Sequence, residues 1–494
     1  MGGGRLFALL TVVIWAPDST IGHFALLADV AAFLSSSGAL GGVAEAFVAH
    51  ELNQQIYSNV VTLDPSIQHP SGLGDMLSPF LSPGEYQSAR ILSTPLDPSL
   101  LPTLGGNALL DQLSLMPGSD VSRFIRNNPA SVSKLLVSPP RAVAVVSWWS
   151  ALSASSQKSM LKAAPEVVGN LDGVPFQVRD AANRLYLKQS IDRLKASIES
   201  GVGRAMLVQT RHHLDILGQI ERTLATKDGD PQRQLLTFDP AGEARAAVVV
   251  GNLATADYVS YLVPGMFFTV QGQMYDWTAI AQDLYKEQAG WMKVLSKTDG
   301  SLAHKTTATV AWLGYTTPGV LDIASLDRAN QGANFLGHAV QGIQAVRVGS
   351  EPFVSLVTHS YGSTAAMIEL ARGGMKVDAL VIIGSPGGAT QSASALSVRG
   401  DNVYVGEAAW DPIVNTAFYG SDPGAASFGA HKMGVSGGVD PISHRSLSAA
   451  IGHLGYFDAG TEAMRNLALI GLDQGALVTN GTSADASRTL AIAQ

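Results

Sequence analysis

The pattern of apolar and polar positions changes in character about halfway along this 494-residue chain. From Gln177 to Lys227, apolar residues recur every three or four positions with charges between them, which predicts amphipathic helices. Gly201 and Gly203 interrupt this stretch, so it is expected to form two helices in an antiparallel hairpin. The run Lys227-Asp228-Gly229-Asp230-Pro231 then reads as a linker, after which the pattern becomes one of short apolar runs.

These later runs have the length and β-branched composition of strands that are buried on both faces. Strands are predicted at Leu235–Phe238, Ala246–Val250, Val259–Val263, Thr309–Leu313, Val354–Thr358, Ala379–Ile383 and Val403–Gly406. Helices are predicted between them at Trp277–Gln288, Ser325–Val346 and Thr364–Arg372. Alternating strands and helices favour a mostly parallel central sheet flanked by helices, preceded here by a largely helical N-terminal region.

Two or three domains are expected from the length. We predict a helical or irregular N-terminal region over 1–140, a helical segment with the amphipathic helix pair over 141–230, and a catalytic domain over 231–494. The helical segment is a candidate cap for a site in the domain that follows. The strongly apolar stretch Arg141–Met160 is predicted to be helical.

An apolar run from Leu6 to Ala16 follows the first charged residue. It is too short to span a membrane, and although it has the length of a signal-peptide core, Pro17 makes a poor cleavage site. A buried strand or helix is therefore favoured, and no transmembrane span is predicted. A cytoplasmic location is favoured slightly, with secretion or the cell envelope as the alternatives.

Composition limits the chemistry. A net charge of −8 disfavours a nucleic-acid partner, and the absence of cysteine excludes disulfides, thiolate metal sites and a cysteine nucleophile. Adjacent histidines on a helix, His212 and His213, point about 100° apart, and no third ligand is evident. No metal and no cofactor are predicted.

The segment Val354–Ser363 carries the clearest chemical signal. An apolar strand runs into a turn of small residues with Ser360 at its apex, and a helical pattern follows. A serine on a sharp strand-to-helix turn is a nucleophile elbow, which exposes the hydroxyl at the N-terminus of the next helix. The usual pattern is Gly-x-Ser-x-Gly; here Thr358 replaces the first glycine and Gly362 keeps the second.

A serine nucleophile needs a histidine to accept its proton and a carboxylate to orient that histidine, in the chain order Ser, Asp or Glu, His. Asp411 stands at the carboxyl end of the strand Val403–Gly406 and is the preferred acid. The preferred base is His453, in a glycine-flanked loop before the final helix. The alternative acids are Asp422, Asp440 and Glu407, and the alternative base is His444, with His431 assigned to a last strand within Phe428–Val435.

An oxyanion hole needs two backbone N–H groups that point at the substrate oxygen. One is expected from Tyr361, directly after the nucleophile. The other is expected in the loop after the strand Val259–Val263, at Gly265 and Met266, where glycine permits close approach to a ligand.

Several segments together resemble an actinobacterial α/β-hydrolase family long carried as a domain of unknown function. They are Asn170–Pro175 with Arg179, Asp180, Asn183 and Arg184, then Val263-Pro264-Gly265, His359-Ser360-Tyr361-Gly362-Ser363, Asp411-Pro412, and His453 with Tyr456 and Phe457. The resemblance covers roughly Trp148 to Tyr456. It implies an α/β-hydrolase fold, a triad of Ser360, Asp411 and His453 and an oxyanion hole near Gly265 and Met266, and it favours His453 over His444. Thr358 and the apolar Met266-Phe267-Phe268 depart from the family pattern.

The sequence thus predicts a serine hydrolase of the esterase or lipase type, which cleaves a carboxylic ester or related acyl bond through an acyl-enzyme. The expected partner is a small acyl ester, with a lipid-like ester as one candidate, because Met266-Phe267-Phe268 is apolar. Two alternatives stay open: an acyltransferase with the same triad, and a catalytically silent binding or assembly protein that keeps the fold. The sequence does not define an oligomeric state.

Overall fold

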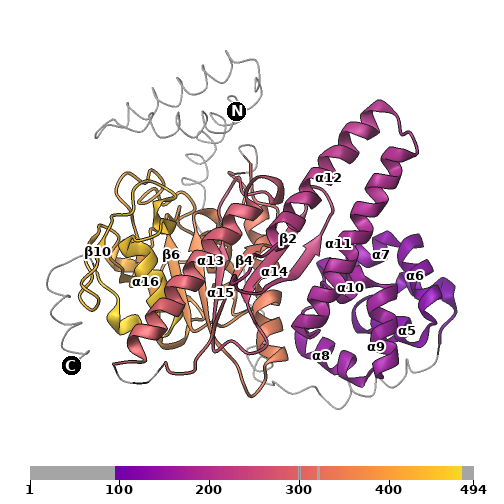
Figure 1. Ribbon diagram of the computed structural model, residues 1–494, viewed down its shortest axis with the longest axis horizontal. Helices are drawn as coiled ribbons and strands as arrows, with labels where there is room; N and C mark the ends of the chain where they lie inside the picture. Colours follow the sequence, from indigo (N-terminus) through magenta and orange to yellow (C-terminus); the bar gives the residue numbers. More distant parts are fainter. Residues whose placement is uncertain (1–94, 299, 301, 320–322, 481–494) are drawn as a thin grey trace, which may run out of the picture. The chain divides into compact units, whose positions relative to one another are not determined.

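The computed structural model describes residues 95–298, 300, 302–319 and 323–480 (Figure 1). The chain divides into two compact units, and all elements named below lie in the unit formed by Leu92–Thr317 and Asp327–Gln494. The described residues 318, 319 and 323–326 belong to the other unit. The apolar run Leu6–Ala16 lies outside the described residues. No helix in the described part of the chain has the length and apolarity that crossing a bilayer requires.

A sheet of eight strands, counted over the described residues, has the order β1-β2-β4-β3-β5-β6-β7-β8. The strands are β1 (Arg233–Asp239), β2 (Arg245–Gly251), β3 (Tyr258–Val263), β4 (Thr307–Leu313), β5 (Phe353–His359), β6 (Ala379–Ile383), β7 (Val403–Gly406) and β8 (His431–Lys432). Strands β1 and β2 form an antiparallel hairpin, and β2 is antiparallel to β4. The other neighbours are parallel, which confirms the mostly parallel sheet that the sequence predicts.

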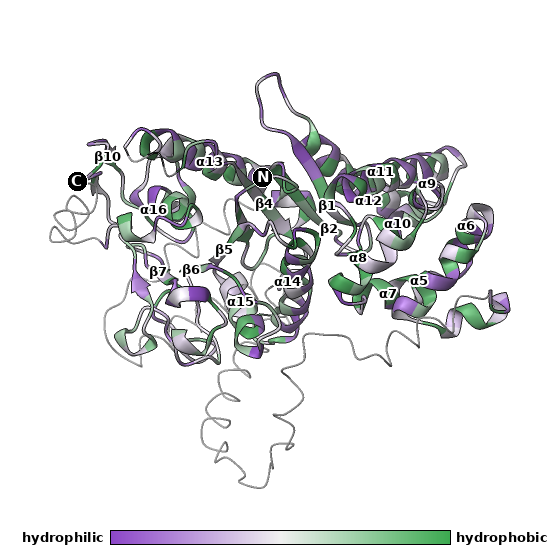
Figure 2. Cartoon of the chain, turned by 90° about the horizontal axis from the view of Figure 1, so that it is seen from below, coloured by the Kyte–Doolittle hydropathy of each residue, from purple (hydrophilic) through white to green (hydrophobic). Residues whose placement is uncertain are grey.

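Helices cover both faces of the sheet. Figure 2 shows α13 (Val270–Leu295) and α16 (Glu462–Gly471) on one face and α14 (Asp327–Val346) and α15 (Tyr361–Arg372) on the other. Helix α13 is longer than the predicted Trp277–Gln288. It starts at a Thr269 cap, whose hydroxyl accepts a hydrogen bond from Gly272 N. Helix α15 starts three residues earlier than predicted because the turn at Ser360 leads directly into it.

The region before the sheet is helical. Its elements are η1 (Pro98–Thr103), α5 (Gly106–Leu115), α6 (Gly118–Asn127), α7 (Pro129–Val137), α8 (Ala142–Ala151), α9 (Ala154–Ala163), α10 (Pro165–Val168), α11 (Phe176–Glu199) and α12 (Arg204–Leu224). The single helix predicted for Arg141–Met160 is instead two, because Leu152 is extended and Ser153 caps α9. Helices α11 and α12 form the predicted hairpin, with Gly201 at positive φ between them. The domain boundaries near residues 140 and 230 stay predictions.

Side chains of α11 and of the connector that precedes it, residues Asn170–Pro175, hold the edge strand β1. Asn170 pairs with the backbone of Phe238 twice, donating to its carbonyl at 2.7 Å and accepting from its N–H at 2.9 Å. Asp180 accepts from Leu235 N at 2.6 Å, and Asn183 donates to Leu235 O at 3.0 Å. A free edge strand exposes unpaired N–H and C=O groups that invite association with other chains. The residues that first indicated the family thus stabilise the edge of the sheet.

Asn170→Ala removes both hydrogen bonds to Phe238 and leaves the strand's peptide groups without these partners. We expect the free energy of unfolding to fall by about 1–3 kcal/mol, measured by urea denaturation followed by circular dichroism. Lys188→Ala, on the exposed side of α11, is the control and should change it by less than about 0.5 kcal/mol. Equal midpoints for the two variants would show that the edge contacts do not stabilise the fold.

Candidate functional site

Ser360 lies at the end of β5 and caps the N-terminus of α15. Its backbone angles, φ 54° and ψ −133°, fall in a region that costs energy for a residue with a side chain and that occurs at functional turns. The side chain is 1% exposed, and no group in the described residues forms a hydrogen bond with its hydroxyl oxygen. The sequence therefore places a buried, unpaired hydroxyl at the positive end of a helix dipole.

Two glycines make room for this turn. A Cβ atom at Gly265 would lie 2.5 Å from Ser360 Cβ and 2.9 Å from its hydroxyl oxygen, and one at Gly362 would collide with the carbonyl oxygens of Val263 and Pro264. Gly265 is thus brought directly against the serine, while the oxyanion hole itself stays a prediction. Thr358, at the first position of the pattern, is buried, and its hydroxyl donates to Val381 O at 2.7 Å.

A buried hydroxyl network lies behind the elbow. Ser363 Oγ donates to Ser360 O at 2.6 Å and bonds to Ser385 Oγ at 2.7 Å, and Ser385 Oγ accepts from Gly387 N at 3.0 Å. Thr364 Oγ1 donates to Gly387 O at 2.7 Å. These bonds fix the loop after β6 to the first turn of α15. The sequence reasoning identified neither Ser363 nor Ser385 as a support of the site.

The structure brings Asp411 and His453 together. Asp411 follows β7, and its Oδ1 lies 2.9 Å from Nδ1 of His453. The Asp411 side chain is buried, and that of His453 is partly exposed. Because a carboxylate only accepts, His453 donates through Nδ1–H, and Nε2 is left as the acceptor. This is the tautomer that a general base for a serine requires.

Tyr456 and the backbone fix the carboxylate. The Tyr456 hydroxyl donates to Asp411 Oδ2 at 2.6 Å and accepts from Ala408 N at 2.8 Å, while Ile413 N donates to Asp411 Oδ1 at 3.0 Å. Burial alone would raise the pKa of Asp411, but the bonds from His453, Tyr456 and Ile413 outweigh it and lower that pKa. Burial and the Asp411 charge raise the pKa of Tyr456, so its hydroxyl stays a donor.

Ser360 and His453 approach the same point of the sheet. Ser360 N donates to Ile383 O at 3.0 Å, and a Cβ on the next residue, Gly384, would lie 3.1 Å from His453 Nδ1 and 2.9 Å from Asp411 Oδ2. The serine hydroxyl does not hydrogen-bond to the imidazole. Such bonds are often long in hydrolases without substrate and tighten when it binds.

The structure gives the alternative acids and bases other surroundings than those of Asp411 and His453. Asp422 Oδ1 accepts from Gly424 N in its own turn. His444 stands on an exposed turn with φ 56°, and His431 is exposed on β8. Burial raises the pKa of Glu407, and its neighbours Asp422 and Asp411 raise it further, so this carboxyl is a poor anionic partner for a histidine.

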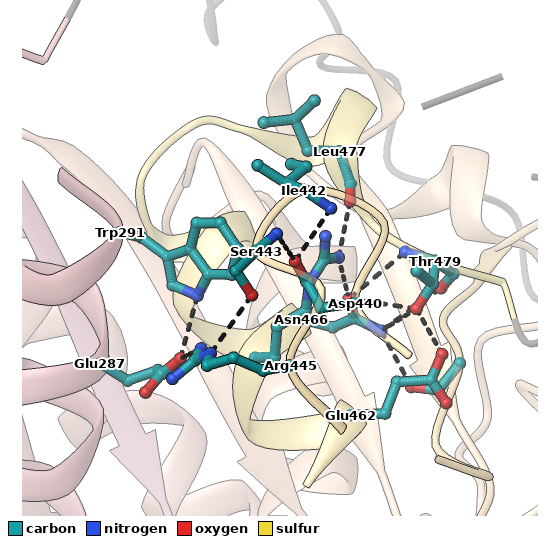
Figure 3. A network of polar contacts seen from close by, with 12 residues as sticks. Glu287, Trp291, Asp440, Ile442, Ser443, Arg445, Glu462, Asn466, Leu477 and Thr479 are labelled. Atoms are coloured by element: carbon teal, nitrogen blue, oxygen red, sulfur yellow. Dashed lines mark hydrogen bonds and ion pairs between the residues drawn. The ribbon is translucent and has the colours of Figure 1, made fainter. Parts of the chain in front are cut away.

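Asp440 belongs to a separate polar network, which Figure 3 shows. Its Oδ2 accepts from Arg465 Nε at 2.6 Å, and the same guanidinium donates to Leu477 O at 2.6 Å and lies over the ring of Trp291. These contacts join α16, α13 and the segment after α16. The buried charge of Asp440 is therefore used to hold the fold together.

The two predicted N–H donors belong to residues next to the elbow in the chain or in space. Tyr361 is the first residue of α15, and its buried hydroxyl accepts from Ala329 N at 2.9 Å. Met266 follows Gly265, which packs on Ser360. Within the described ranges, no group of three or more His, Asp or Glu side chains is arranged to hold a metal ion.

Comparisons with known proteins agree with this architecture. Residues 239–421 match a family described as alpha/beta hydrolase. An uncharacterized protein of Mycobacterium tuberculosis is 28% identical over 386 residues, which cover 68% of this chain and 56% of that protein. An uncharacterized protein of Mycobacterium bovis is 28% identical over 234 residues, covering 45% of this chain and 82% of that protein. The α/β-hydrolase fold and the resemblance to an actinobacterial family of unknown function are thus confirmed.

Solved structures that match part of the chain include a dienelactone hydrolase from Anabaena variabilis, at 12% identity and a TM-score of 0.28, covering 51% of this chain and 99% of that one. An arylesterase is similar at 11% identity and a TM-score of 0.30, covering 58% of this chain and 98% of that one.

Proposed function

We propose that this protein of α/β-hydrolase fold is a serine hydrolase that cleaves a carboxylic ester or related acyl bond through an acyl-enzyme. The observation that carries the proposal is the Asp411–His453 pair, held at 2.9 Å and packed against Gly384, next to Ile383, whose carbonyl accepts from Ser360 N. Ser360 itself has a buried hydroxyl on a strained elbow. Strain, burial and a carboxylate-oriented imidazole together are typical of a nucleophilic serine site.

In the proposed reaction, Ser360 Oγ forms a bond to the acyl carbon as its proton passes to His453 Nε2. The N–H groups of Tyr361 and Met266 stabilise the oxyanion. The tetrahedral intermediate collapses when the bond to the alcohol oxygen breaks, and His453 gives its proton to that oxygen. Water, deprotonated by His453, then attacks the acyl-enzyme, and the acid leaves as Ser360 regains its proton.

Asp411 stabilises the imidazolium that forms twice in this cycle. Its lowered pKa keeps the carboxylate charged over the neutral pH range, and Tyr456 holds it in place from the opposite oxygen. The charge is buried, so its interaction with the imidazolium is screened by water less than a surface pair would be.

The substrate class that fits the site is an ester with an apolar acyl group, a lipid-like ester included. Trp410, Ile451 and Leu454 are 72%, 63% and 40% exposed, and they are sequence neighbours of Asp411 and His453. Their two loops are joined, because Gly452 N donates to Ala409 O at 2.9 Å. Exposed apolar side chains gathered at one site offer a surface to an apolar ligand.

We therefore expect kcat/KM for p-nitrophenyl esters to rise about tenfold from acetate to octanoate, which equals about 1.4 kcal/mol of transition-state binding. Trp410→Ser should reduce this ratio at least threefold. Val348→Ser, which removes a valine that is 75% exposed but not adjacent in sequence to any triad residue, should not. A ratio that does not depend on Trp410 would contradict the proposed acyl surface.

The proposed function is tested by pre-steady-state kinetics with p-nitrophenyl acetate. A burst of one p-nitrophenolate per chain, followed by slower turnover, is expected for an acyl-enzyme. Adding an alcohol acceptor separates the alternatives, since a dominant ester product would indicate an acyltransferase. If esters of every chain length give no burst and no turnover, the result would favour the alternative of a catalytically silent binding protein.

A further inference from the structure

His359, the last residue of β5, connects the nucleophile strand to the loop of the base. Its Nε2 lies 2.6 Å from the backbone carbonyl oxygen of His453, and because a carbonyl only accepts, the ring donates. Its ring is 4.4 Å from that of His453 and 5.6 Å from that of Phe457. The residue directly before Ser360 therefore contacts both the backbone and the imidazole of the residue that serves as base.

The His453 loop has few other attachments. Gly452 has a positive φ of 68°, and Ile451 and Leu454 on either side are exposed. Besides the bond from His453 Nδ1 to Asp411, the loop is joined to its neighbours through Gly452 N, which donates to Ala409 O, and through the His453 carbonyl. A loop with little buried apolar surface moves readily, so each of these bonds has a large share in fixing the imidazole.

We propose, on the basis of the proposed function, that His359 is a positioning residue, whose ring N–H holds the His453 backbone so that the imidazole stays within reach of Ser360 and Asp411. This role requires the Nε2–H of His359 as a hydrogen-bond donor and does not require a charge on the ring.

The surroundings keep His359 neutral. Burial, and then the neighbouring His453, lower the pKa of His359 to about 3. The titratable groups that face it are His453, Asp411 and Tyr456. A neutral ring next to His453 does not repel the imidazolium that forms during the reaction. With Nε2 protonated, Nδ1 is a buried acceptor without a partner among the described residues.

Glutamine and methionine offer a matched pair of substitutions, because they have nearly the same shape and only glutamine can donate where Nε2 does. We expect His359→Met to lower kcat about tenfold to a hundredfold with KM changed less than about threefold, since misplacing a base by about 1 Å has such effects. His359→Gln should restore kcat to within about threefold of wild type. The acid limb of the kcat/KM profile should move to lower pH in the methionine variant only, because its imidazolium is less well paired with Asp411.

Nitrogen-15 NMR of histidine-labelled wild-type protein tests the contact without any activity. We expect His359 to show a neutral ring with its proton on Nε2 from pH 8 to pH 5. A ring that carries its only proton on Nδ1 in this range would overturn the proposal. So would equal kcat values and pH profiles for the glutamine and methionine variants. If instead the NMR result is as expected and wild type shows no esterase activity, it is the proposed function that fails.

Discussion

Ser360→Ala is expected to lower kcat for p-nitrophenyl butyrate by about 10⁴- to 10⁶-fold, down to the background that a fold without a nucleophile provides. The change removes one buried oxygen that has no hydrogen-bond partner, so the fold should be unaffected. Steady-state kinetics measure the loss, and circular dichroism with thermal denaturation measures the fold. Ser394→Ala, at an exposed position of the short 3₁₀ helix η2 (Ala393–Ala395), is the matched control and should keep wild-type activity.

Turnover by Ser360→Ala above about one hundredth of the wild-type rate would show that another group attacks the ester. A folded variant with the full loss assigns the reaction to this hydroxyl.

Asp411→Asn is expected to lower kcat by about 10³- to 10⁴-fold, as loss of the orienting carboxylate does in serine proteases. The amide has no charge to stabilise the imidazolium, and its NH₂ group favours the wrong imidazole tautomer. Because the carboxylate charge favours the imidazolium, its removal should also move the acid limb of the profile to lower pH, so the loss should be at least as large in alkaline solution as near neutral pH. A pH–rate profile from pH 5 to pH 10 measures it.

Asp422→Asn is the matched control, because Asp422 accepts from Gly424 N in its own turn and is the acid that the chain order also allowed. It should keep kcat within about threefold of wild type. The opposite result, a large loss in Asp422→Asn and a small one in Asp411→Asn, would show that Asp422 and not Asp411 is the carboxylate that orients the base.

Local sequence predicts most of the sheet because its strands are short apolar runs with clear ends. The predicted strands lie within the observed ones, and Ala379–Ile383 and Val403–Gly406 match end to end. The split between α8 and α9 was missed because Leu152 and Ser153 continue a helical pattern, and only the extended backbone at Leu152 separates the helices. A single capping serine is a weak signal within an apolar run.

The supports of the site were not predictable in the same way. Tyr456 reaches Asp411 across 45 residues of chain, and His359 reaches the carbonyl of His453 across 94. Such contacts depend on which loops meet at the carboxyl end of the sheet, which no local pattern specifies. Tyr456 belongs to the family pattern as a residue shortly after His453, without a stated role. Its hydroxyl, which bonds to both Asp411 and Ala408 N, gives this residue a physical role.

The family pattern also contains residues that support the fold and not the candidate site. Asn170 and Asp180 were first noticed as part of a family pattern, without a function. The hydrogen bonds that they make to β1 show that this part of the pattern stabilises the sheet edge and does not belong to the chemistry.

In the proposed function, Ser360 is a nucleophile made reactive by His453 and Asp411. Labelling the native protein with a fluorophosphonate probe and mapping the modified peptide by mass spectrometry tests this role. We expect one adduct per chain, on Ser360, formed at least a hundredfold more slowly in Asp411→Asn and absent after denaturation. Labelling at another residue, or no labelling of the folded protein, would contradict it.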